Sequence, residues 1–470
     1  MPTETRTQRR ELSLFRRTSI VVVVVLAVTS GILGAANTLQ GPRLSSAEIN
    51  GQGAISRTGQ RLILHTNQPV AHVAEDQISI TPSVPFTTTT SGNDVIITLD
   101  DMLRYNADYT VSASMKSLYS GAPATLEYSF TTPDIDVYTL TRDPGGVAGD
   151  EPDRVVRSSL SGATPSEDVF TAGRIQEYAV SGSTLAMIVL DEQDRTSLVV
   201  RDLSTGIDTD VHVPRAGALR YLKSSGPSGL FGFTVAGMAQ PDGSTSPTTL
   251  FVYDLATPNG VARQVTGAGG SQLSTVAWAF APGTTSAVVQ DYDQQLYLVD
   301  TITESVPSPL GDHAEVHGFI PGTVELVVSD LDQSTVIDLQ AAKSRTFIPR
   351  TAEVDRHYYP GKRLMIDHEN SYIQEFDIPD ENRQYSTSAL YLIDSSGTRE
   401  IYRPAPTTRI RNVCLSPNGK VAAVETMPES RQDDDYPNIP SYLPMTTYFV
   451  DVATNQILLA RGGWMPDWCQ

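Results

Sequence analysis

The sequence predicts an all-β protein that contains repeated antiparallel sheets, and three observations lead to this fold class. Short segments rich in β-branched and aromatic residues recur along the 470 residues, while long amphipathic helical patterns are absent. The 34 glycines and 30 prolines mark turns between these segments. Strands that end in aspartate recur at a spacing near 50 residues from about residue 136 onward, which is the period of a β-propeller blade.

The N-terminal end predicts a membrane anchor. Five arginines lie within residues 1–17, and an apolar run extends from Ser19 to Ala36. A helix of this length spans roughly 27 Å, enough for a bilayer core. The arginines place residues 1–17 in the cytoplasm and the C-terminal domains outside. We therefore expect a single-pass transmembrane signal-anchor over residues 18–36 in the cell membrane. The alternative is a secreted protein, cleaved near Ala36 after a run of small residues.

The remainder of the chain is strongly acidic. The formal net charge is −20, and without residues 1–17 the 29 basic and 52 acidic residues give −23. Nucleic-acid phosphates would be repelled by such a surface. The composition therefore excludes a nucleic-acid partner.

Residues 37–50 read as a polar tether, and residues 51–134 read as a β-sandwich. Turn residues separate short alternating segments at intervals of about ten residues, which is typical of an Ig-like sandwich; the segments are Arg61–Thr66, Gln77–Thr81, Phe86–Ser91, Val95–Leu99, Tyr109–Met115 and Thr125–Thr132.

Four pieces of this region carry a family resemblance, namely Asn67–Val70, Ile78–Pro82, Tyr109–Val111 and Tyr128–Thr132. Their order resembles the bacterial Ig-like domains of the SbsA S-layer type over roughly 90 residues. The resemblance implies a spacer or adhesion module that projects from the cell surface.

Residues 135–470 predict a seven-bladed β-propeller. Six strands end in aspartate, at positions 202, 254, 300, 338, 394 and 451, and Arg154–Ser158 has serine near that position in a seventh unit. Ser416–Lys420 resembles the Ser-Pro-Asp-Gly-Lys turn of TolB-like and dipeptidyl-peptidase-type propellers, with asparagine replacing aspartate. This resemblance concerns the fold and implies no activity. The alternative is a string of further Ig-like sandwiches.

The two ends of this region predict how the ring closes. Val137–Arg142 begins partway through a unit, and Trp464–Gln470 resembles the start of a unit that then stops. We expect Trp464–Gln470 to pair as the innermost strand of the first blade, which leaves no open sheet edge. Cys414 and Cys469, the only two cysteines, would then lie side by side and form a disulfide in an oxidising compartment. Two buried free thiols are the alternative.

No motif predicts catalysis. A Gly-x-Ser-x-Gly elbow is absent. His313 and His317 lie in an expected blade connection, where their spacing does not bring the two rings together on a metal. Aspartates in turns such as Asp291–Asp293 are explained by turn formation, and no calcium-loop series is present. We therefore expect no catalytic residue, no metal site and no cofactor.

Two long insertions predict a binding surface. Glu369–Thr387 and Met427–Met445 separate the second and third strands of the last two blades, so they open on one face of the ring. Aromatic residues on long loops suit contacts with partners or glycans; the candidate binding residues are Tyr372, Glu375, Phe376, Asp377, Tyr385, Asp433, Asp434, Asp435, Tyr436 and Tyr442. Solvated loops without a partner are the alternative.

The predicted function is non-enzymatic binding or scaffolding in the bacterial cell envelope, toward another envelope protein or a cell-wall glycan. A glycan hydrolase or lyase with carboxylates in the central pocket is one alternative. An extracytoplasmic sensor domain is another.

Overall fold

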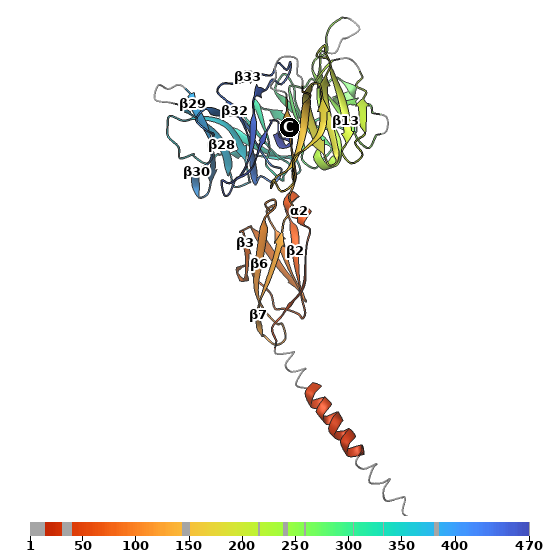
Figure 1. Ribbon diagram of the computed structural model, residues 1–470, viewed down its shortest axis with the longest axis vertical. Coiled ribbons are helices and arrows are strands. Elements are labelled where there is room, and N and C mark those ends of the chain that lie inside the picture. Colours follow the sequence, from red (N-terminus) through yellow and green to blue (C-terminus); the bar gives the residue numbers. More distant parts are fainter. Residues whose placement is uncertain are drawn as a thin grey trace, which may run out of the picture. The chain divides into compact units, whose positions relative to one another are not determined.

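The computed structural model describes residues 15–30, 40–142, 151–214, 217–237, 243–257, 260–303, 305–331, 333–379 and 385–469 (Figure 1). The chain forms two compact units, Met1–Leu103 with Ala107–Pro133, and Arg104–Asn106 with Asp134–Gln470. Residues 15–30 are helical. No helix among the described residues is long and apolar enough to cross a membrane. Residues 31–36 of the expected anchor lie outside the described ranges.

The first unit consists of two antiparallel sheets with strand orders β1-β2-β5-β4 and β3-β6-β7. Its elements are β1 (Leu44–Ile49), α2 (Gly51–Ser56), β2 (Gln60–Thr66), η1 (Glu75–Gln77), β3 (Ile78–Thr81), β4 (Phe86–Ser91), β5 (Asp94–Leu99), β6 (Asp108–Lys116) and β7 (Pro123–Thr131). All six strands expected from the sequence are present. Strand β1 lies inside the segment expected as a tether. None of its side chains is fully buried, and its sequence LSSAEI lacks a regular apolar alternation.

Each sheet of the first unit buries one face. Val95, Ile97 and Leu99 of β5 are buried while their neighbours are partly exposed. The same period of two buries alternate residues of β6. The alternation therefore fixes which side of each strand faces the core.

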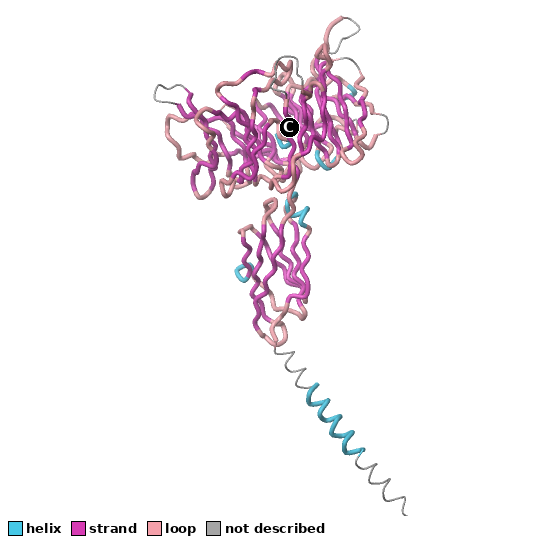
Figure 2. The backbone as a smooth tube through the Cα atoms, viewed as in Figure 1, coloured by secondary structure: helices cyan, strands magenta, loops and turns pink. Residues whose placement is uncertain are grey.

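The second unit contains seven antiparallel sheets that follow one another in chain order. Their strands are magenta in Figure 2. The first sheet, ordered β10-β9-β8, has β8 (Asp136–Thr141), β9 (Asp153–Ser159) and β10 (Glu167–Ala172). The next three run in sequence order and consist of β11 (Ile175–Ser181), β12 (Thr184–Leu190), β13 (Thr196–Asp202) and β14 (Asp208–Val211); β15 (Ala218–Ser224), β16 (Leu230–Ala236), β17 (Thr249–Asp254) and β18 (Arg263–Gln264); and β19 (Ala277–Phe280), β20 (Ser286–Gln290), β21 (Gln295–Asp300) and β22 (Ser308–Asp312). Short 3₁₀ turns are η2 (Gly226–Ser228) and η3 (Ala268–Gly270).

The last three sheets follow the same plan. They consist of β23 (Glu315–Phe319), β24 (Glu325–Ser329), β25 (Ser334–Asp338) and β26 (Lys343–Phe347); β27 (Tyr359–Met365), β28 (Tyr372–Pro379), β29 (Tyr385–Asp394) and β30 (Gly397–Tyr402); and β31 (Thr408–Leu415), β32 (Val421–Pro428), β35 (Thr446–Asp451) and β36 (Ile457–Gly462). A two-stranded ribbon, β33 (Gln432–Asp433) with β34 (Tyr442–Leu443), is inserted between β32 and β35. Successive four-stranded meanders of this kind define a propeller-like fold.

Each sheet packs on the next through a buried apolar cluster. Phe231 and Phe233 of the third sheet, for example, join a cluster with residues of the second. The first strands of successive sheets also contact one another, as β11 with β15 and β27 with β31 do, so the first strand of each sheet lies innermost. The seventh sheet packs on the first through Val137 and Phe449.

The aspartate that ends each repeated strand caps a turn, as the sequence predicts. These residues end the third strand of six sheets. The carboxylate of each accepts a hydrogen bond from the backbone N–H two residues later, at 2.7–3.0 Å; the donors are Ser204, Ala256, Ile302, Gln340, Ser396 and Ala453. The recurrence of aspartate at this position is therefore explained by turn formation.

The C-terminal segment joins the first sheet at one residue. Trp464 and Leu140 of β8 exchange two backbone hydrogen bonds at 2.8 and 2.9 Å. The prediction that the strand continues beyond Trp464 is wrong. Met465 has φ 52°, and Asp467–Cys469 forms the 3₁₀ turn η4. Pro466 also has no N–H to continue the ladder. The expected disulfide between Cys414 and Cys469 is present, with Cα atoms 5.2 Å apart.

Candidate ligand-binding site

The first predicted insertion, Glu369–Thr387, is largely strand rather than loop, because β28 and β29 extend through most of it (Figure 1). Tyr372 and Phe376 are buried in the cluster between the fifth and sixth sheets. The Tyr372 hydroxyl donates a hydrogen bond to the carbonyl of Arg350. These two aromatic residues therefore offer no binding surface. The backbone of Tyr385 pairs with Pro379, and the tip at residues 380–384 lies outside the described residues.

The second insertion, Met427–Met445, contains the β33–β34 ribbon. Its aspartates differ in environment, since Asp433 and Asp435 are exposed while Asp434 is buried. Tyr442 packs partly against an apolar cluster, and the Arg431 guanidinium lies 4.8 Å from its ring centroid.

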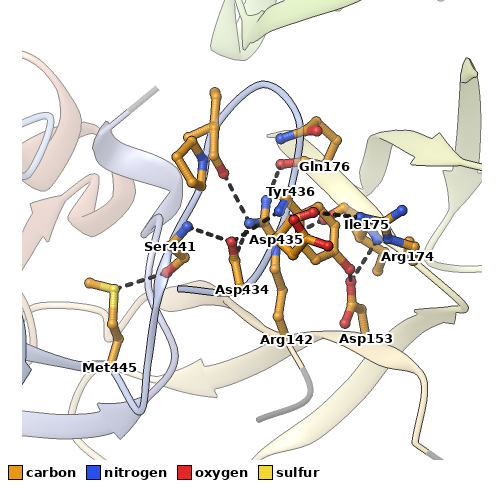
Figure 3. Close-up of polar contacts among 12 residues, drawn as sticks. Arg142, Asp153, Arg174, Ile175, Gln176, Asp434, Asp435, Tyr436, Ser441 and Met445 are labelled. Atoms are coloured by element: carbon orange, nitrogen blue, oxygen red, sulfur yellow. Dashed lines mark hydrogen bonds and ion pairs between the residues drawn. The ribbon is translucent and has the colours of Figure 1, made fainter. Parts of the chain in front are cut away.

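Asp434 pairs with Arg142, which follows β8 of the first sheet (Figure 3). The two side chains, each 1% exposed, meet at 2.5 Å. Arg142 also donates to the carbonyls of Ile439 at 2.9 Å and Gln176 at 2.7 Å. Burial lowers the pKa of Arg142, and the Asp434 carboxylate opposes this effect. The arginine thus connects the first, second and seventh sheets.

Tyr436 extends this connection, and we call Arg142, Asp153, Asp434 and Tyr436 the closing lock (Figure 3). The Tyr436 hydroxyl donates to the Asp153 carboxylate, and the Arg142 guanidinium lies 3.7 Å from the Tyr436 ring centroid. On its other side Arg142 stacks on Trp464 at 4.7 Å. Asp434 and Tyr436 are predicted as binding residues, but their side chains hold the ends of the second unit together. The polar groups of both side chains are therefore occupied by contacts within the protein.

The inner strands carry a recurring irregularity. In five of the seven sheets, the first strand shifts register against the second, and the residues within the shifts are Gln176 in β11, Tyr221 and Leu222 in β15, His317 in β23, Gly361 and Lys362 in β27, and Arg411 in β31. A β-bulge turns a side chain away from the direction that the ladder would give it. The bulges therefore gather polar side chains at the inner strands.

A cleft of about 720 Å³ lies between the fifth and sixth sheets. Its volume suits a small-molecule ligand. The turn from β24 to β25 and the connection from β26 to β27 contribute to its lining. None of the ten candidate binding residues from the sequence lines it. Its lining includes Glu315, His317, Ser329, Gln333, Thr346, Lys362, Arg363, Met365 and Gln374.

Two cations in this cleft have no carboxylate partner among the described residues. Lys362 donates a hydrogen bond to the amide oxygen of Asn412 at 2.8 Å. Arg363 stacks on Tyr372 at 4.9 Å, and its buried Nε has no hydrogen-bond partner within the described part of the chain. Burial lowers the pKa of Lys362, while the carboxylates of Glu425 and Glu375 oppose this effect. Two carboxylates, Glu315 and Asp330, also line the cleft. They contact His317 and His313 rather than Lys362 or Arg363, so the two cations stand apart from the negative charges of the cleft.

Histidine 317 is a third polar group of the cleft. Its Nε2 lies 2.7 Å from Ser329 Oγ, and burial lowers the pKa of the ring. His313 instead contacts Asp330 at 3.1 Å. Within the described ranges, no cluster of three or more metal-ligating side chains occurs.

Two predicted site residues, Glu375 and Asp377, are half-buried on one face of β28. Burial, together with the neighbouring Asp377, raises the pKa of Glu375 to about 7. Burial also raises the pKa of Asp377. A carboxyl with a pKa of about 7 can exchange a proton near neutral pH. Sequence reasoning identified both residues but not Lys362 or Arg363, which no motif marks.

Comparison with known proteins identifies no family. No family model matches the chain, and no curated protein matches it. Among solved structures, it is similar to dihydro-heme d1 dehydrogenase NirN in complex with DHE, at 12% identity and a TM-score of 0.41, over 70% of this chain and 74% of that one. An auxiliary nutrient binding protein from Bacteroides thetaiotaomicron matches at 11% identity and a TM-score of 0.31, over 77% and 86%.

A structure from a study of two prolyl endopeptidases matches at 12% identity and a TM-score of 0.43, over 78% of this chain and 50% of that one. Likenesses of this size carry no information about activity. The assignment of the fold rests on strand order and packing.

Proposed function

We propose that this chain is a non-enzymatic binding protein of the bacterial cell envelope, whose ligand site is the cleft between the fifth and sixth sheets. In this proposal the second unit is a seven-bladed propeller closed by its C-terminal segment. The first unit is an Ig-like spacer, and residues 18–36 anchor the chain in the membrane with both units outside the cytoplasm.

This proposal depends on Lys362 and Arg363, which have no carboxylate within ion-pair distance in the described part of the chain. A crowded positive charge without a counter-ion lowers stability, so a pair of them in a ligand-sized cleft is more readily explained by binding than by folding. Complementary charge also gives specificity. The ligand is therefore an anion, and among the partners expected from the sequence a cell-wall glycan that bears carboxylate or phosphate groups fits this chemistry.

The test is binding of a purified anionic cell-wall polymer to the full-length protein, measured by calorimetry. We expect the Lys362→Gln/Arg363→Gln variant to lose at least about tenfold in affinity, because two charge-assisted hydrogen bonds are each worth roughly 1.5–3 kcal/mol. The control is Lys343→Gln/Arg356→Gln, which removes the same charge from exposed positions outside the cleft. Equal weakening by the two variants would argue for a diffuse charge effect and against the site.

A second candidate is a glycan-cleaving enzyme, and the carboxyl pair Glu375 and Asp377 is the observation that favours it. Residues two apart on a strand lie on one face about 7 Å apart, and glycosidases use carboxyl groups at comparable separations. Release of reducing ends from the same polymer by the wild type but not by Glu375→Gln would support this candidate over simple binding.

A further inference from the structure

The polar side chains of the cleft are already satisfied by one another. His317 contacts Ser329, and Gln333 donates to Thr346 Oγ1 at 2.9 Å. Gln374 donates to the carbonyl of Gly361 at 3.2 Å. A ligand rich in amide or hydroxyl groups would therefore find few free hydrogen-bonding partners here. The lining carboxylates Glu315 and Asp330 contact histidines. Among the described residues, Lys362 and Arg363 have no carboxylate within ion-pair distance, and the cleft also has an apolar surface.

That apolar surface lies at the other end of the cleft. Leu331 is 100% exposed and Ile348 is 76% exposed, and both line the cleft. Leu331 lies in the turn after β24, and Ile348 directly follows the outermost strand β26, whereas Lys362 and Arg363 lie on the innermost strand β27. The buried side chains of Phe347 and Met365 line the space as well.

We propose that the cleft binds a small amphiphilic anion, with its acidic head on Lys362 and Arg363 and its apolar chain extending toward Leu331 and Ile348. This inference rests on the anion site of the proposed function, and it takes a small amphiphile as the ligand in place of the hydroxyl-rich glycan. Charge complementarity places the head at the inner strand. An alkyl chain that covers the exposed side chains of Leu331 and Ile348 would lower the free energy of the complex, because burial of apolar surface is favourable.

The proposal is tested by titrating the full-length protein with inorganic phosphate and with ethyl, hexyl and decyl phosphate below their micelle concentrations. Full burial of a methylene corresponds to about 0.8 kcal/mol, so we expect affinity to rise by up to about fourfold for each added CH₂ that the cleft covers. Lys362→Gln/Arg363→Gln should abolish binding of the whole series.

The decisive variant is Leu331→Ser/Ile348→Ser, which changes two exposed side chains and should leave the fold intact. It should bind ethyl phosphate as the wild type does but lose most of the gain with chain length. The matched control is Tyr292→Ser/Val306→Ser, which removes exposed apolar side chains, 62% and 72% exposed, that do not line the cleft.

Two failures can be told apart. If neither inorganic phosphate nor any alkyl phosphate binds the wild type, the proposed anion site fails, and this inference fails with it. If the phosphates bind but decyl phosphate is no tighter than ethyl phosphate, or if the Leu331/Ile348 variant keeps the full gain, the inference about the apolar chain is overturned while the anion site stands.

Discussion

Removal of one charge from the closing lock gives a sharp test of how the second unit is held together. In Asp434→Asn the shape of the side chain is kept, while Arg142 remains as a buried charge without a counter-ion. Both side chains are 1% exposed in the native protein. Loss of one partner of such a buried pair costs about 3–5 kcal/mol of unfolding free energy. The exposed pair Arg195–Asp191, 76% and 39% exposed, supplies the control Asp191→Asn, for which we expect at most about 1 kcal/mol.

Urea unfolding of the full-length protein, followed by tryptophan fluorescence, measures this difference. All three tryptophans, Trp278, Trp464 and Trp468, belong to the second unit, so the signal reports that unit alone. We also expect Arg142→Met/Asp434→Leu to recover much of the lost unfolding free energy, because burial of two apolar side chains involves no desolvation of charge. If Asp434→Asn destabilises no more than Asp191→Asn, the buried pair does not hold the first and seventh sheets together.

Three further predictions concern stability. Reduction of the Cys414–Cys469 disulfide, which closes a separation of 55 residues, should lower the unfolding free energy by roughly 4 kcal/mol. Burial raises the pKa of Asp467 to about 7, so the folded state holds a proton that the unfolded chain releases near pH 4. The contribution of Asp467 to stability therefore falls as the pH rises from about 4 to 7, and Asp467→Asn should remove this contribution from the pH profile. Gly232→Ala should cost about 1–3 kcal/mol by overpacking, because a Cβ there would meet the ring of Trp278.

Each of these has a result that would contradict it. An unchanged urea midpoint after reduction would mean that the disulfide adds nothing to the closed form. A pH profile of Asp467→Asn that parallels the wild type from pH 4 to 7 would refute the assigned titration. Wild-type stability of Gly232→Ala, with Gly173→Ala at an open position as the comparison, would show that the third and fourth sheets separate easily.

Much of the second unit follows from local sequence. The aspartate that ends each third strand is visible because its role is local, since it caps a turn two residues away. The pairing of Cys414 with Cys469 was predictable because the repeat places the chain ends together. The strands of the first unit were predictable from a period of two, except β1, whose sequence LSSAEI has no regular apolar alternation.

The site was less predictable, since it depends on contacts distant in sequence. The sequence predicts Tyr372 and Phe376 as loop aromatics, whereas both lie on strand β28 and are buried. Asp434 finds its partner Arg142 almost 300 residues away, which no local pattern encodes. Lys362 reaches the cleft through a β-bulge, and a bulge depends on the register of two strands rather than on a motif.

The most direct test of the proposed site is an experimental structure of the protein with decyl phosphate. The account predicts the phosphate within hydrogen-bonding distance of Lys362 Nζ and the Arg363 guanidinium, with the alkyl chain between the fifth and sixth sheets and its end near Ile348. Density for the ligand at another surface, with the cleft filled only by solvent, would contradict the account.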